Sequence, residues 1–129
     1  MNKRYHKNVY WESDFDPWVQ NTILAYGLKG QDLTTHYIQR LRSRHISKVP
    51  TVDELLRGKV MELEVADDGK LQKAVIRMSH NKSRDMITAV GFSEEFGLIY
   101  ITSFTTPRSH RNWKPDVSKY ERGENNESA

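Results

Sequence analysis

The chain has 129 residues, of which 36% are hydrophobic and 29% are charged, and its formal net charge is +3. It contains no cysteine, which excludes disulfides and thiolate zinc sites. No apolar run approaches the roughly 20 residues that span a bilayer, and no apolar signal core follows the basic N-terminus, so we expect a cytoplasmic protein without membrane contact. We expect one domain over residues 1–122 and a disordered polar tail over residues 123–129.

The first half of the chain carries the signals of three short helices. A helix over residues 16–26 begins with Asp-Pro, which suits an N-cap and a first helical position, and it stops at the glycine that follows. Asp32 is the predicted cap of a second helix over residues 33–45. Capping-box spacing in residues 51–54 opens a third helix, which ends at Gly58.

From residue 59 onward the hydrophobic period changes from helical to two, which is typical of strands. Glu62 and Glu64 alternate with apolar residues, so we expect them on the solvent face of the first strand. Asp68-Gly69 predicts a tight hairpin. Further strands are predicted over residues 71–79, 86–92 and 98–104. The predicted fold class is α+β, with two to three N-terminal helices packed on a four-stranded antiparallel sheet.

The second predicted helix carries a polar row at the edge of its apolar stripe. His36, Arg40 and Arg44 are spaced four apart, so they lie on consecutive turns of one side. Two guanidiniums can hold phosphate oxygens, and a histidine can transfer a proton near neutral pH. Cleavage of RNA in which its own 2′-hydroxyl attacks the phosphate can be catalysed by these groups without a metal. In the structural alternative, the arginines are solvated or pair with acids, and His36 makes a local hydrogen bond.

The C-terminal region gathers residue types that contact nucleic acids. Hydroxyls, cations and a tryptophan crowd together there, and phosphate contacts with base stacking use these types. Thr106 and His110 are candidate catalytic groups. The candidate nucleic-acid contacts are Arg108, Arg111, Trp113, Lys114 and Lys119. In the equally weighted alternative, this segment is a basic extension that packs Trp113 against the helices.

The second helix and the strands after it resemble a known group of proteins. The motif that carries the resemblance is His36-x3-Arg40-Leu41-x2-Arg44-x-Ile46. With the acidic strand and glycine hairpin that follow, it is similar to small phage and plasmid domains usually grouped with the barnase, colicin and RelE-like toxin nucleases. The resemblance implies RNA cleavage without a metal, and a cognate antitoxin as a partner. It also implies that His36 transfers protons, that Arg40 and Arg44 bind phosphate, and that Thr105 or Thr106 supplies a terminal polar group.

Two functional hypotheses of different classes follow. The first is a metal-independent endoribonuclease without a cofactor, in which the 2′-hydroxyl attacks the phosphate and leaves a cyclic phosphate. His36 is its base or acid, Arg40 and Arg44 stabilise the phosphorane, and His110 is a second proton carrier. The alternative is a non-enzymatic phage-type protein that binds and inhibits a host protein or a nucleic-acid complex through residues 108–122.

Overall fold

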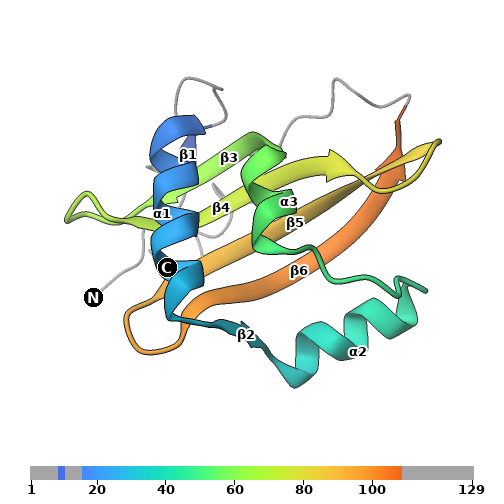
Figure 1. The fold of residues 1–129 in the computed structure, drawn as a ribbon, viewed down its shortest axis with the longest axis horizontal. Helices are drawn as coiled ribbons and strands as arrows, with labels where there is room; N and C mark the ends of the chain where they lie inside the picture. The colour runs from blue at the N-terminus through green and yellow to red at the C-terminus, as the bar shows by residue number, and fades with distance from the viewer. Residues whose placement is uncertain (1–8, 11–15, 109–129) are drawn as a thin grey trace, which may run out of the picture.

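The computed structural model describes residues 9–10 and 16–108 (Figure 1). All three helices lie on one face of a single sheet. The helices are α1 (Asp16–Lys29), α2 (Thr35–Ser43) and α3 (Val52–Arg57). The strands are β1 (Val9–Tyr10), β2 (Gln31–Leu33), β3 (Lys59–Val65), β4 (Leu71–Ser79), β5 (Arg84–Ser93) and β6 (Gly97–Pro107).

The sheet is mixed, with the strand order β1-β3-β4-β5-β6-β2. Its four long strands form the predicted antiparallel meander, which confirms the α+β class. The expectation of a purely antiparallel, four-stranded sheet is wrong, because β2 pairs in parallel with β6. Apart from the two-residue β1, which pairs with β3 at the opposite edge, the sheet therefore has five strands.

The strand β2 was not predicted, because the predicted end of α1 and the predicted start of α2 were both misplaced. α1 continues past Gly27 to Lys29, and the chain leaves the helix at Gly30, where φ is 153°. Thr34 caps α2 in place of Asp32, and its hydroxyl accepts a hydrogen bond from the Tyr37 amide. The three residues between these two ends are extended and pair with β6.

Local signals gave correct positions for the ends of α3 and for the β3–β4 hairpin. Thr51 and Glu54 form the predicted capping box of α3, and Gly58 is its C-cap. Gly69 adopts a φ of 86° in the β3–β4 hairpin, as the Asp-Gly pair predicted. The last strand continues past its predicted end at residue 104 and ends at Pro107.

The sheet separates two apolar clusters. The larger lies under the helices and includes Val19, Tyr37 and Leu55. The smaller consists of strand residues on the opposite face, which we call the second face. Glu62 and Glu64 lie on that face but are only 5% and 8% exposed, so their predicted solvent placement is wrong. A break in register between Val60 and Glu62 changes the alternation at this point.

Gly97 allows the close approach that joins α1, β2 and β6. Its φ is 87°, and a Cβ atom there would lie 2.5 Å from the Gly30 carbonyl oxygen and 2.7 Å from that of Tyr26. The Leu98 amide donates to the same Gly30 oxygen at 2.9 Å. Any side chain at position 97 would therefore push apart the segment that carries the parallel pair.

Substitution of Gly97 by alanine should destabilise the fold more than the same change at Gly69. Both glycines have a positive φ, but a Cβ at Gly69 would meet nothing within 4 Å. Gly69→Ala should cost about 1–2 kcal/mol from the backbone conformation alone, whereas Gly97→Ala adds a backbone clash and should cost at least about 3 kcal/mol. Urea unfolding measures the loss of unfolding free energy in each variant. Equal losses would show that the contact at Gly97 relaxes without cost.

Candidate nucleic-acid interface

Buried hydroxyl groups fix how α2 sits on the sheet. The Tyr37 hydroxyl lies 2.7 Å from the Ser103 hydroxyl, which in turn lies 2.8 Å from the Thr88 hydroxyl. The Tyr37 ring also packs against Tyr100, with 5.7 Å between ring centroids. Burial raises the pKa of Tyr37, although the hydrogen bond with Ser103 opposes the change, so the phenol stays neutral. With this side of α2 fixed on the sheet, the opposite side faces solvent.

The predicted row on α2 divides between solvent and sheet. The side chains of His36 and Arg40 are exposed. Arg44 is half-buried, and its Nη1 donates to the Thr102 hydroxyl at 2.9 Å and to the Ser103 carbonyl at 2.7 Å. Arg44 therefore joins the end of α2 to β6, while His36 and Arg40 stand on the open side of the helix.

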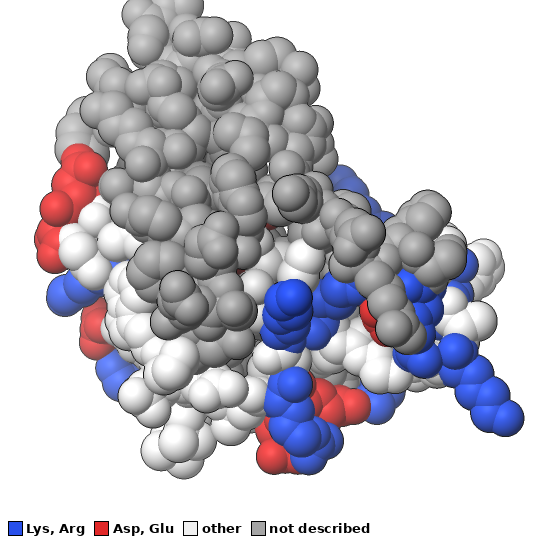
Figure 2. All heavy atoms as spheres, turned by 90° about the horizontal axis from the view of Figure 1, so that it is seen from above, with Lys and Arg blue, Asp and Glu red and all other residues white. Residues whose placement is uncertain are grey.

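Cations outnumber acids along α2 and the connection after it. Arg40, Arg42 and Lys48 are exposed, and we call them the α2 basic face. Among the described residues no carboxylate forms an ion pair with Arg40 or Arg42, whereas Lys48 pairs with Glu54. Figure 2 views the molecule from the side opposite α2, and lysine and arginine side chains gather there too, toward the end that carries the β4–β5 loop.

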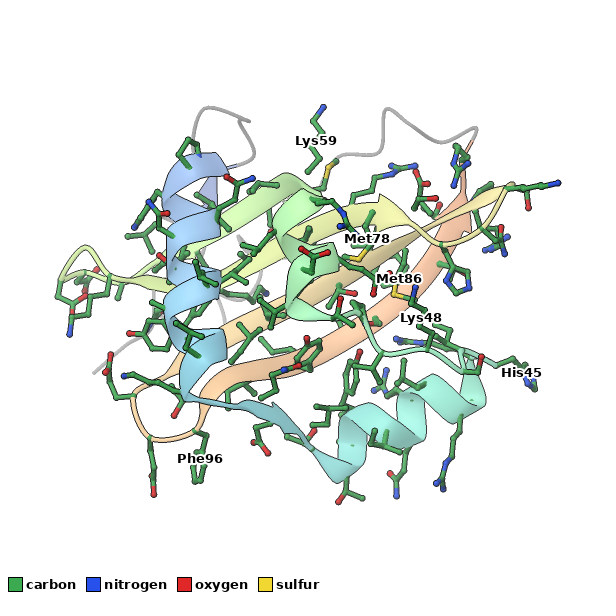
Figure 3. All side chains as sticks on the ribbon, in the orientation of Figure 1. His45, Lys48, Lys59, Met78, Met86 and Phe96 are labelled. Atoms are coloured by element: carbon green, nitrogen blue, oxygen red, sulfur yellow. The ribbon has the colours of Figure 1, made fainter. Side chains whose placement is uncertain are left out.

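The side chains of His45 and Lys48, which follow α2, point in different directions (Figure 3). His45 follows α2 with a φ of 56° and projects away from the ribbon. Lys48 lies beside the end of the sheet, where it lines a small cavity together with His80 and Met86. This cavity has a volume of about 10 Å³, which is room for one water molecule and not for a nucleobase.

Thr106 and Arg108 belong to the second face. Thr106 pairs with Asp85 across β5 and β6, on the side of the sheet opposite α2. Arg108 Nε donates to Asp85 Oδ1 at 2.9 Å, and the rest of its guanidinium donates to the Ser79 hydroxyl, to two carbonyl groups of the β4–β5 loop and to the carbonyl of Arg84 at the start of β5. Its donors are therefore used within the protein.

Asp85 also forms an ion pair with a second arginine, on the neighbouring strand β4. Arg77 Nε donates to Asp85 Oδ2 at 2.9 Å. Burial would raise the pKa of Asp85, but the hydrogen bonds and charges of Arg77 and Arg108 outweigh it and hold that pKa below its ordinary value. The carboxylate thus links β4, β5 and the end of β6.

The predicted site residues do not all come together. The α2 row lies on the helix side of the sheet, and Thr106 and Arg108 lie on the second face. His110, Arg111, Trp113, Lys114 and Lys119 lie outside the described residues, as does the predicted tail. Sequence reasoning did not select Arg42 or Lys48, although the absence of acids between Asp32 and Asp53 was a usable signal.

Comparison with protein-family models, curated proteins and solved structures found no match for this chain. The resemblance to toxin nucleases therefore stays a prediction. No helix in the described ranges is long and apolar enough to cross a membrane. Within those same ranges, no group of three or more histidine or acidic side chains is placed to hold a metal ion.

Removal of the Arg108 guanidinium should lower the stability of the domain and make it unfold at a higher pH during acidification. Arg108→Ala removes two part-buried hydrogen bonds, to Asp85 and Arg84, and three exposed ones, which together should cost about 1–3 kcal/mol. Because the folded-state pKa of Asp85 is depressed, its stabilising effect is present above the unfolded pKa of about 3.9 and is lost as pH falls through the folded value. Loss of Arg108 raises that folded pKa, so acid unfolding should begin at higher pH.

Urea unfolding at several pH values and an NMR titration of the Asp85 carboxyl carbon measure these effects. Arg57→Ala is the matched control, because Arg57 forms an exposed ion pair with Asp53 on α3, and such pairs contribute little. Similar small losses in the two variants would contradict a structural role for Arg108.

Proposed function

We propose that this protein binds RNA through the phosphate backbone, using the α2 basic face. The observation that carries the proposal is the exposure of Arg40 and Arg42 on one helix without an ion pair to any described carboxylate. A guanidinium can hold two phosphate oxygens at once, and exposed cations near a polyanion release its counterions. Such contacts supply affinity without reading the base sequence.

The rigidity of α2 supports this assignment. Tyr37 binds the buried Ser103 hydroxyl at one end of the contact, and Arg44 binds Thr102 and the Ser103 carbonyl at the other. The helix that presents the cations therefore loses little freedom when a ligand binds, and less ordering entropy opposes association. Arg44 acts in this proposal as a residue that positions the α2 basic face.

Removal of two cations should weaken RNA binding in a salt-dependent manner. Arg40→Gln with Arg42→Gln deletes up to two phosphate contacts, so the slope of log affinity against log salt should fall by about 0.7 for each contact to single-stranded RNA. Fluorescence anisotropy at several salt concentrations measures the slope. Arg57→Gln removes an exposed arginine from α3 and should leave it unchanged. A wild-type protein that binds no RNA at low salt would favour the host-protein alternative.

Metal-independent RNA cleavage is the second candidate, and the exposure of His36 one turn before Arg40 favours it. His36 would take the proton of the 2′-hydroxyl. The O2′ atom would then attack phosphorus, the bond from phosphorus to O5′ would break, and Arg40 would stabilise the phosphorane. The leaving oxygen needs a proton from a second group. Thr106 lies on the opposite side of the sheet, and His110 is the remaining predicted donor.

Incubation of RNA with the protein in EDTA tests this candidate. If His36 is the base, the wild type should produce fragments ending in 2′,3′-cyclic phosphate, and His36→Ala should slow cleavage by about 100-fold or more. His45→Asn is the control, because it removes an exposed imidazole at the end of the same helix and asparagine tolerates the positive φ. RNA binding without cleavage would contradict the nuclease candidate and leave RNA binding as the proposed function.

A further inference from the structure

The second face of the sheet has an apolar centre to which no described helix contributes. All the helix residues in the core belong to the cluster on the opposite face. The second cluster contains only strand residues, Met61, Val75, Ile87 and Ala89, with Phe104 packed against it. These side chains are buried to a degree that is typical of a covered core, since Ile87 is 1% exposed. A sheet face of this composition needs a layer of protein over it.

Two carboxylates border this apolar centre. Glu62 and Glu64 lie two residues apart on β3 and so share the second face. Burial raises the pKa of Glu64 above its ordinary value. The positive charge of Lys73 opposes this change, and the negative charge of Glu62 adds to it. Buried carboxylates are stable beside cations or hydrogen-bond donors. Lys73 lies opposite Glu64 on β4, and a covering layer that brings further positive charge as well as apolar side chains would suit both carboxylates.

The described chain ends on the same face. Arg108, the last described residue, is held there by Asp85. The sequence continues for 21 residues, from 109 to 129. Fully extended they reach about 70 Å, whereas six strands span only about 25 Å from first to last. The chain that follows Arg108 is therefore long enough to cross the whole sheet.

The composition of residues 109–122 matches that face. This segment has four positive and two negative charges, and it contains Trp113 and Tyr120. Residues before Val9 are a poorer candidate, because they leave β1 at the sheet edge, where Val9 and Tyr10 pair with Glu64 and Leu63 and not with the strand that carries Ile87. Residues 1–8 are also basic, so charge does not separate the two candidates, but aromatic content and point of departure favour the C-terminal segment.

We propose that residues 109–122 dock on the second face of the sheet, with Trp113 over the apolar cluster and lysines or arginines beside Glu62 and Glu64. The segment then completes the domain as a second layer opposite the helices. Its cations neutralise buried carboxylates and are not free for RNA. This inference is independent of the RNA-binding proposal, which uses the other side of the molecule.

The methionine methyl groups of the full chain test the docking. Met61 lies on the second face, whereas Met78 and Met86 lie on the helix face and serve as internal controls. In Trp113→Ala, loss of the indole ring should shift the Met61 methyl signal in a carbon–proton NMR spectrum and leave the other two in place. Cleavage by trypsin within residues 109–122 should become at least about ten times faster, which corresponds to about 1.4 kcal/mol of lost docking.

A second set of variants tests the charges. One double variant carries Glu62→Gln and Glu64→Gln, and another carries Lys114→Gln and Lys119→Gln. Each should speed trypsin cleavage at the arginines of the segment. In the variant with all four substitutions, the increase in cleavage rate should be smaller than the product of the two separate increases. Multiplicative effects would overturn the ionic part of the proposal. An unmoved Met61 signal in Trp113→Ala would overturn the docking itself. A Met61 signal that depends on protein concentration would assign the covering layer to a second copy and would also overturn it.

Discussion

The parallel pairing of β2 with β6 is the constraint on which the rest of the structure depends. It requires the chain to leave α1 at Gly30 and to pass within contact distance of Gly97, where no side chain fits. Once this pair forms, the residue that follows β2 starts a helix on the outer side of β6. The position of α2, and therefore of every candidate RNA contact on it, is set by two glycines and three extended residues.

The orientation of α2 depends on a different kind of interaction. An apolar stripe alone would tolerate some rotation of a nine-residue helix, but the hydroxyl contacts from Tyr37 through Ser103 to Thr88 require one arrangement. A buried hydroxyl without a partner would cost about 1–3 kcal/mol, so the network penalises alternatives. Tyr37 and Leu41 face the sheet through this contact, and Arg40 and Arg42, which flank that buried side of the helix, are exposed.

The sequence predicted features that are encoded within a few neighbouring residues. The capping box at Thr51, the Asp68-Gly69 hairpin and the period of the long strands are of this kind. β2 could not be found in the same way, since three residues show no period and their pairing depends on the distant Gly97. The burial of Glu62 and Glu64 was also missed, because alternation divides the residues of a strand between two faces but does not reveal that both faces are covered.

Candidate site residues show the same limit. Helical spacing correctly placed His36, Arg40 and Arg44 on successive turns, but it could not show that β6 supplies acceptors for Arg44. Arg108 was grouped with phosphate contacts because of its neighbours in sequence, yet Asp85 and the β4–β5 loop use its donors. The sheet stands between these two groups of cations. A ligand that touches both must pass around the end of the sheet, which a flexible RNA strand can do and a compact substrate cannot.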